Sequence, residues 1–159
     1  AGRQLMKRGI KLAGLLLLAV LVVFQFFRPE KNQAGSEQQY DLLQVSSVPD
    51  NLATILRASC YDCHSNHTNY PWYSRISPVS WYLDKHIREG KEDLNLSEYG
   101  LLDKAEKIGV MSDIYDAVEA GTMPLQSYLL IHGEARLSPE EMDALLDWAD
   151  GESLRLMRD

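Results

Sequence analysis

The chain has 159 residues, enough for one domain of ordinary size and a short additional segment. Its formal charge is −7, and the four basic residues of the first eleven leave 12 Lys and Arg against 23 Asp and Glu in the rest, a formal charge of −11. Nucleic-acid binding depends on basic residues that neutralise phosphates, so this balance argues against it. The acidic surface is compatible with docking to a basic patch on a redox partner, and simple solubility is the alternative.

The N-terminal segment combines basic and apolar residues. An apolar run from Leu12 to Phe27, interrupted only by Gln25, follows four bases at positions 3, 7, 8 and 11. Its length is at the low end for a membrane-spanning helix, and the positive-inside rule puts the N-terminus in the cytoplasm. A cleaved secretory signal is the alternative, but bulky residues stand where a peptidase needs small ones. We therefore expect residues 1–28 to be an uncleaved transmembrane anchor in the cytoplasmic (inner) membrane, residues 29–44 a linker, and residues 45–159 a domain on the extracytoplasmic (periplasmic) face.

A short helix is predicted from Pro49 to Leu56, running into Cys60. The segment Cys60-Tyr61-Asp62-Cys63-His64 then has the Cys-x-x-Cys-His spacing of covalent c-type haem attachment. In a helical turn these three side chains point the same way, so two thiols and one imidazole can meet a single porphyrin. We predict one covalently attached haem c, bound through Cys60 and Cys63, with His64 as an iron ligand.

Other interpretations of the two cysteines stay open at this point. A thioredoxin-like redox pair lies at a strand-to-helix junction, and the residues before Cys60 do not have the sequence pattern of a strand. A zinc site needs further ligands at a short spacing, and His67 is the residue that could supply one. Coincidence is the third interpretation, because the motif is short.

An aromatic loop, Asn69-Tyr70-Pro71-Trp72-Tyr73, precedes a helix that is expected to begin at Pro78 and to end at Gly90. We expect the aromatic side chains to line the haem crevice and to exclude water from the iron, and Arg75 to pair with a haem propionate. These cofactor-binding candidates are Tyr70, Trp72, Trp81 and Arg75, together with the less specific Tyr73. Ordinary core and surface roles are the alternative for each of them.

Residues 101–120 predict a third helical region, broken near Gly109 and ended by Gly121. Met123 follows this end and precedes Pro124, which restricts its backbone to extended conformations. A thioether in so constrained a loop is a good second axial ligand, so we predict Met123 as the metal ligand that complements His64. The alternative is that Met123 only fills core space.

Several other residues could ligate the iron in place of Met123. His86 is the strongest rival, although a buried, hydrogen-bonded histidine is the commoner case. The weaker candidates are Met111, Met142, His67 and His132.

The last helix is expected to start at Ser138-Pro139-Glu140-Glu141, which has the pattern of a helix cap. The apolar residues that follow repeat at helical spacing, and no alternating pattern of strand length occurs anywhere in the chain. The sequence therefore predicts an all-α fold.

Four motifs together resemble the bacterial haem-binding domain family over about residues 45–150. They are the segment 60–66, the aromatic loop, Pro78-Val79-Ser80-Trp81, and Gly121-Thr122-Met123-Pro124 followed by Tyr128. The arrangement is also similar to small class I cytochromes, which have a helix before the motif, a loop-borne second ligand and a terminal helix. The resemblance implies an all-α, cytochrome c-like domain around one haem, here preceded by a single transmembrane helix.

We therefore expect a membrane-anchored monohaem c-type cytochrome that transfers electrons to redox partner proteins, and not an enzyme. It would serve as a shuttle or as a subunit of a respiratory or photosynthetic complex. An open iron site would instead suit a peroxidase-like enzyme or a haem-based sensor.

Overall fold

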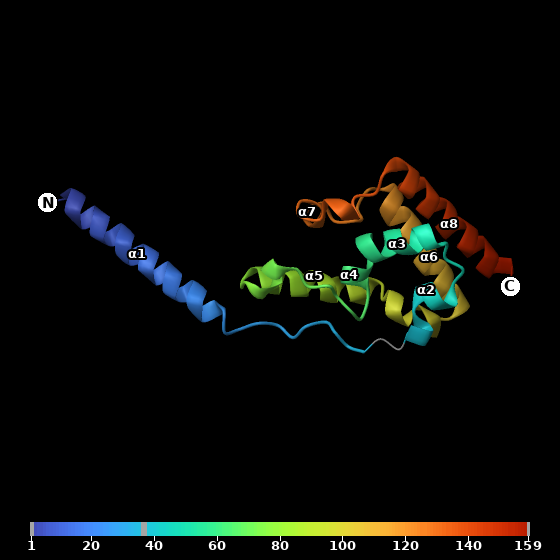
Figure 1. Ribbon diagram of the computed structural model, residues 1–159, viewed down its shortest axis with the longest axis horizontal. Helices are drawn as coiled ribbons and strands as arrows, with labels where there is room; N and C mark the ends of the chain where they lie inside the picture. The colour runs from blue at the N-terminus through green and yellow to red at the C-terminus, as the bar shows by residue number, and fades with distance from the viewer. Residues whose placement is uncertain (1, 36–37, 159) are drawn as a thin grey trace. The chain divides into compact units, whose positions relative to one another are not determined.

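The computed structural model describes residues 2–35 and 38–158, and its regular structure there is helical (Figure 1). The described chain has one isolated β-bridge, between Gln33 and His67. By its contacts the chain divides into two compact units, one formed by Ala1–Lys31 and Tyr70–His86 and the other by Asn32–Asn69 and Ile87–Asp159. The predicted all-α class is confirmed.

The first unit joins the chain after helix α1 (Gly2–Phe24) to the segment that starts helix α5 (Val79–Asp93). The side-chain amide of Gln25 donates to the Ser77 carbonyl at 2.9 Å and accepts from the Ser77 N–H at 3.0 Å. The Trp81 indole N–H donates to the Phe27 carbonyl at 2.7 Å, and its ring lies 5.0 Å from that of Phe24. These contacts give Trp81 a well-defined environment within this unit.

The prediction of a membrane-spanning anchor is wrong. In the described part of the chain, no helix combines the length and the hydropathy that crossing a bilayer requires. The apolar part of α1 begins at Leu12, and the helix ends at Phe24, so Phe26 and Phe27 do not extend it. A span needs about 20 apolar residues. The predicted location in the cytoplasmic membrane depended on this anchor and is therefore also wrong.

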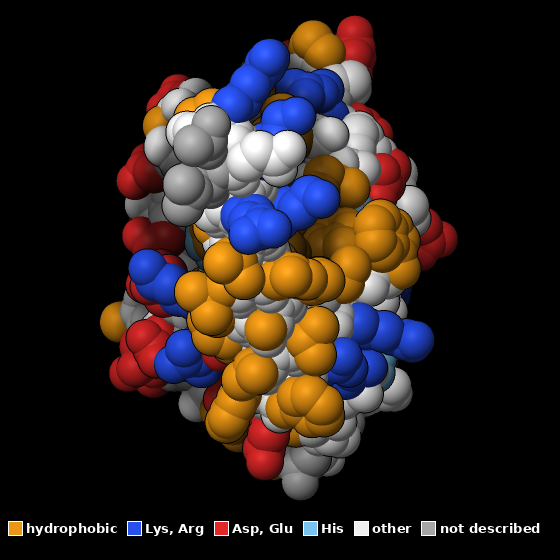
Figure 2. Space-filling model, turned by 90° about the vertical axis from the view of Figure 1, so that its left-hand side faces the viewer, with side chains coloured by type: hydrophobic (Ala, Val, Ile, Leu, Met, Phe, Trp, Pro, Cys, Tyr) orange, Lys and Arg blue, Asp and Glu red, His pale blue; other side chains and the backbone are white. Residues whose placement is uncertain are grey.

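Exposed apolar side chains are numerous in α1, where Leu12, Leu15 and Leu16 are each more than half exposed. Figure 2 shows one face of the molecule, on which hydrophobic side chains gather with Lys and Arg side chains around them.

The second unit has its core between helices α3 (Asp50–Ser59), α6 (Lys104–Glu119) and α8 (Pro139–Arg158). Helices α6 and α8 pack along one another (Figure 1). Leucine, isoleucine, valine, methionine and tyrosine side chains from several segments fill this core: Leu42, Leu52, Ile55, Leu56, Leu96, Tyr99, Met111, Val118 and Leu145. The helix predicted ahead of the cysteines is α3, and one of its faces belongs to this core.

Shorter helices connect the long ones. They are α2 (Leu42–Val45), α4 (Tyr61–His64), α7 (Gln126–Leu129) and the 3-10 helices Gln38–Tyr40, Trp72–Arg75, Leu96–Leu101 and Gly133–Ala135. Within the range predicted as a linker, Leu42 is fully buried and the Asn32 side chain donates to the Ser65 carbonyl at 2.8 Å. Residues 36 and 37 of that range lie outside the described residues.

Two predicted helix ends are confirmed, and each has a local cause. Gly121 follows α6 with φ of 64°, a left-handed conformation that glycine adopts without strain. At the start of α8, the Ser138 hydroxyl accepts from the Glu141 N–H at 3.2 Å, and the Glu141 carboxylate accepts from the Ser138 N–H at 2.8 Å. This reciprocal pair is the predicted cap.

Two glycines behave differently from their predictions. Helix α5 continues past Gly90 to Asp93, and α6 runs through Gly109 without a break. A single glycine weakens a helix by only about 1 kcal/mol, which neighbouring contacts can offset.

Candidate haem site

The Cys-x-x-Cys-His segment forms the predicted helical turn. Cys60 ends α3, and α4 begins directly after it, with the Cys63 N–H donating to the Cys60 carbonyl at 3.2 Å and the His64 N–H donating to the same carbonyl at 3.0 Å. Both cysteines are free thiols. The turn therefore places the two thiols and the imidazole close together.

The His64 ring is fixed by a backbone acceptor. Its Nδ1 lies 3.1 Å from the Leu94 carbonyl oxygen. Because a carbonyl can only accept, Nδ1 carries the proton and Nε2 keeps its lone pair. Metal-binding histidines are commonly oriented in this way by a hydrogen bond from the other ring nitrogen. The ring is therefore prepared to ligate a metal through Nε2.

Burial controls the ionisation of the thiols. It raises the pKa of Cys60 to about 12, with a smaller contribution from Cys63. Burial likewise raises the pKa of Cys63 to about 11, with a further contribution from the Asp62 carboxylate. Both groups are therefore protonated thiols at neutral pH, the form in which an S–H bond adds across a vinyl group.

Met123 lies between α6 and α7 on a segment that is tied to the end of α6. The Ala117 carbonyl accepts from the Met123 N–H at 3.2 Å, from the Thr122 N–H at 3.0 Å and from the Thr122 hydroxyl at 3.0 Å. The left-handed Gly121 turns the chain just before these contacts. Met123 is half-buried, and its backbone is held at one defined position relative to α6.

A cavity of about 370 Å³ brings Cys60, His64 and Met123 together. Its other lining residues are mainly apolar: Leu56, Ser59, Asp93, Leu94, Leu96, Asp113, Ile114, Ala117 and Val118. Cofactor pockets in proteins usually measure about 300–1,000 Å³. Apolar walls, one thiol, one oriented imidazole and one thioether fit a haem. Cys63 does not line the cavity itself but stands on the same turn.

Helix α5 approaches this turn closely at Gly90. A Cβ atom placed on Gly90 would lie 3.1 Å from the Cys63 carbonyl oxygen and 3.4 Å from both the Cys63 Cβ and the His64 Cε1. A side chain at position 90 would therefore require the turn or α5 to shift by a few tenths of an ångström. The sequence pattern suggested a helix end because the packing partner is remote in the chain.

The aromatic and arginine candidates lie in the first unit, whereas every residue that lines the cavity lies in the second. Trp72 is 76% exposed, Trp81 contacts Phe27 and Phe24, and the Tyr70 ring lies 5.4 Å from the Lys31 ammonium. Arg75 ends a 3-10 helix. A role at the haem stays a prediction for these residues.

The rival ligands have other contacts. The His86 Nδ1 lies 2.8 Å from the Tyr82 carbonyl in the first unit, and His132 stacks on Tyr128. Met111 is fully buried in the core, and Met142 packs against it. His67 borders a separate polar cavity of about 460 Å³.

Within residues 2–35 and 38–158, no group of three or more His, Cys, Asp or Glu side chains is arranged to hold a metal ion.

Sequence reasoning missed several residues around the turn. Asp62, between the two cysteines, accepts from the Tyr128 hydroxyl at 3.0 Å and from the Asn69 N–H at 3.0 Å. The Tyr61 hydroxyl donates to Asp41 at 2.7 Å. Burial, followed by Asp62, raises the pKa of Tyr128 above its usual range, so the phenol stays a donor. Asp62 and Tyr128 belong to the motifs on which the family resemblance rests. Membership of these motifs was the only indication in the sequence that the two residues matter.

Comparison with known proteins supports haem binding. The chain is 27% identical over 112 residues to the cytochrome c peroxidase Ccp of Escherichia coli (strain K12), across 67% of this chain and 24% of that protein. The chain thus spans about a quarter of the length of this relative. No solved structure matches the chain. A model of the family described as "Haem-binding domain" matches residues 19–151, and the chain therefore belongs to the haem-binding domain family.

Proposed function

We propose that this chain is a monohaem c-type cytochrome domain, similar in plan to class I cytochromes, that transfers single electrons. Cys60 and Cys63 would hold the haem covalently, and His64 and Met123 would supply the two protein ligands of its iron. The observation that carries this proposal is the cavity that Cys60, His64 and Met123 share. The hydrogen bond from Nδ1 of His64 to the Leu94 carbonyl leaves Nε2 as the nitrogen that can bind the iron.

Attachment uses the two protonated thiols. Cys60 and Cys63 would each hold the haem through a thioether, with the thiol hydrogen passing to the second carbon of the same vinyl group. The addition needs no net oxidant or reductant. Because Cys60 and Cys63 belong to the same turn as His64, attachment also fixes the porphyrin edge relative to the imidazole.

The haem supplies a one-electron ferric–ferrous couple when it is bound. His64 and Met123 would keep the coordination of the iron constant between the two oxidation states, and a Met/His pair would raise the reduction potential relative to two histidines. The apolar cavity walls Leu56, Leu96 and Val118 exclude water and favour the less charged ferrous form.

The electron donor and acceptor are proposed to be proteins. The formal charge of −11 after residue 11 supports a partner with a basic surface and argues against nucleic acid. Both a free shuttle and a fixed subunit of an electron-transfer complex agree with such docking.

A second candidate function is a peroxidase-like reaction at an open iron site. The similarity to the peroxidase of Escherichia coli favours it. The matched region makes up only 24% of that protein, so the similarity concerns one part of the peroxidase and not its whole length. This function requires an iron without Met123 as its ligand.

Absorption spectroscopy of the haem-loaded full chain, with Met123→Ala as the variant, tests the proposal. The parent protein should be low-spin with the weak far-red band of methionine on ferric iron, and should retain haem on denaturing gels. Met123→Ala should abolish that band, convert the haem to high spin and permit carbon monoxide binding. Met157→Ala, which changes a methionine that is 56% exposed, is the control and should leave the spectrum unchanged.

Two outcomes would contradict the proposal. A parent protein that is already high-spin and binds carbon monoxide or peroxide readily would favour the enzyme. An unaltered far-red band in Met123→Ala would move the ligand assignment to another residue, with His86 the first to test.

A further inference from the structure

The turn that carries the cysteines is hydrogen-bonded to the segment that follows Met123. Asp62 lies between Cys60 and Cys63, and Tyr128 lies on α7, shortly after Met123. The Tyr128 hydroxyl donates to Oδ2 of Asp62 at 3.0 Å across 66 residues of sequence. The bond therefore joins the segment of one proposed iron ligand to the turn of the other.

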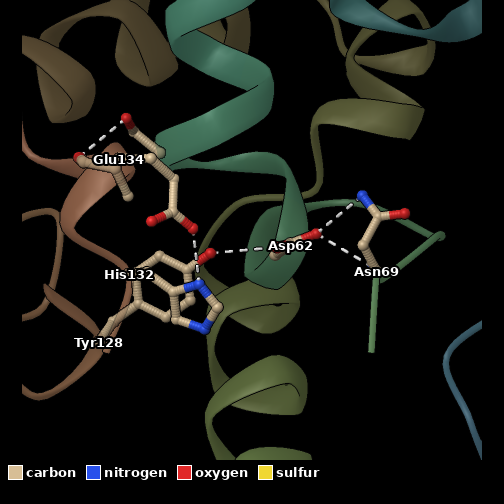
Figure 3. A network of polar contacts seen from close by, with 7 residues as sticks. Asp62, Asn69, Tyr128, His132 and Glu134 are labelled. Carbon is tan, nitrogen blue, oxygen red and sulfur yellow. Dashed lines mark hydrogen bonds and ion pairs between the residues drawn. The ribbon is translucent and has the colours of Figure 1, made fainter. Parts of the chain in front are cut away.

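The Asp62 carboxylate is held in place from its other side. Its Oδ1 accepts from the Asn69 N–H at 3.0 Å and from the Asn69 side-chain amide at 3.2 Å, and its backbone carbonyl accepts from the Thr68 hydroxyl at 2.7 Å. Figure 3 shows Asn69 and Tyr128 meeting Asp62 from opposite sides. One oxygen is thus presented to Tyr128 in a fixed direction.

The Tyr128 ring is also fixed. The imidazole of His132 stacks on it with ring centres 4.2 Å apart and an interplanar angle of 15°. The Nδ1 of His132 lies 2.9 Å from the Glu134 carboxylate, which limits rotation of the imidazole (Figure 3). A second hydrogen bond joins the residues on either side: the Ser59 hydroxyl, at the end of α3, donates to the carbonyl of Ala135, which follows α7, at 3.0 Å.

Two of the three apolar side chains that directly follow Tyr128 are exposed. Leu129 is buried, but Leu130 is 85% exposed and Ile131 is 65% exposed. Upstream, the Met123 N–H donates to the Ala117 carbonyl of α6. The Asp62–Tyr128 bond, together with the Ser59–Ala135 bond, therefore relates the part of the chain downstream of Met123 to the part that carries His64.

We propose that the Asp62–Tyr128 hydrogen bond is a positioning contact that keeps Met123 on the iron. It rests on the proposed function, since it presupposes Met123 as a ligand. Met123 then lies between two fixed points, Ala117 on α6 and Asp62 on the haem-attachment turn. Loss of the Asp62–Tyr128 hydrogen bond lets the Met123 thioether leave the iron more often. An external ligand then competes more effectively for the iron.

Imidazole binding to the ferric, haem-loaded full chain tests this contact, because imidazole binds when Met123 leaves the iron. Tyr128→Phe removes one hydroxyl and keeps the stacked ring. A hydrogen bond to a carboxylate predicts an apparent imidazole affinity about tenfold higher or more, with a weakened far-red band. Tyr115→Phe, which removes a hydroxyl from α6, is the control and should bind imidazole as the parent does. Asp62→Asn should shift the affinity in the same direction by less.

The double variant Tyr128→Phe with Asp62→Asn separates positioning from general destabilisation. If the two groups act through one bond, the double variant should bind imidazole no more tightly than Tyr128→Phe alone. Additive increases in affinity would overturn the proposal. Parent-like imidazole affinity in Tyr128→Phe would also overturn it, even if the thermal midpoint fell.

Met123→Ala, measured in parallel, distinguishes this inference from the proposed function. If it abolishes the far-red band while Tyr128→Phe changes nothing, the ligand assignment stands and the positioning role is wrong. If Met123→Ala leaves the band intact, the ligand assignment itself is wrong and the positioning role falls with it.

Discussion

Gly90 lies where α5 passes over the turn of Cys63 and His64. The nearest atom to a Cβ at this position would be a backbone carbonyl oxygen, at 3.1 Å. Backbone within a hydrogen-bonded turn cannot move aside as the end of a flexible side chain can. The absence of a side chain at Gly90 is therefore part of how the turn and α5 fit together.

Gly90→Ala should lower the free energy of unfolding, and Gly109→Ala should raise it. Both changes add helix propensity worth about 1 kcal/mol. At Gly109 a Cβ meets nothing within 4 Å, so the gain is retained. At Gly90 the overpacking costs about 1–3 kcal/mol and exceeds the gain. Urea unfolding followed by circular dichroism measures both changes, and equal stabilisation by the two alanines would contradict the close approach.

At the scale of the helices, the sequence predicted what local residues determine. Gly121 and the Ser138–Glu141 cap act within a few residues, and both ends were predicted correctly. Contacts between segments remote in sequence were not predictable, because no local sequence pattern at one partner indicates the other. The His64–Leu94 bond spans 30 residues and the Asp62–Tyr128 bond spans 66. The cavity could be anticipated only through its ligand types, Cys60, His64 and Met123.

Helix α8 contains a buried carboxylate whose charge should contribute to stability. Glu152 is 5% exposed and accepts two hydrogen bonds from Arg155, each of 2.9 Å. The bonds from Arg155 lower the pKa of Glu152 below 4.5, although desolvation opposes them. The ionised form is therefore favoured in the folded state. Its contribution is complete above the unfolded pKa and is lost as the pH falls through the lower, folded pKa.

Glu152→Gln should destabilise the protein at pH 7 by about 1–2 kcal/mol, as the loss of a charge-assisted hydrogen bond predicts. The difference from the parent should shrink as the pH falls from the unfolded pKa towards the lower, folded pKa, where the parent also loses the charge. Urea unfolding at stepwise lower pH measures it, with Glu30→Gln at an exposed position outside any helix as the control. A difference that does not depend on pH would mean that the carboxylate acts by shape alone.

At the scale of the whole molecule, the candidate haem residues are concentrated in one compact unit. Cys60, Cys63, His64 and Met123 all belong to the unit of residues 32–69 and 87–159, as does every residue that lines the cavity. The other unit contains α1 and Trp81, which are joined by the contact of Phe24 with the indole ring. Haem binding should therefore not depend on the N-terminal helix.

Removal of residues 1–24 should leave the haem spectrum and its far-red band unchanged. Tryptophan fluorescence should change, because Trp81 loses its ring contact with Phe24. Met123→Ala in the shortened chain should still abolish the far-red band, which confirms that the retained haem has the same ligand. A shift to high-spin haem in the shortened chain would contradict the expectation. It would mean that the cavity requires a contribution from the first unit, and would make Tyr70, Trp72, Arg75 and Trp81 the first residues to substitute.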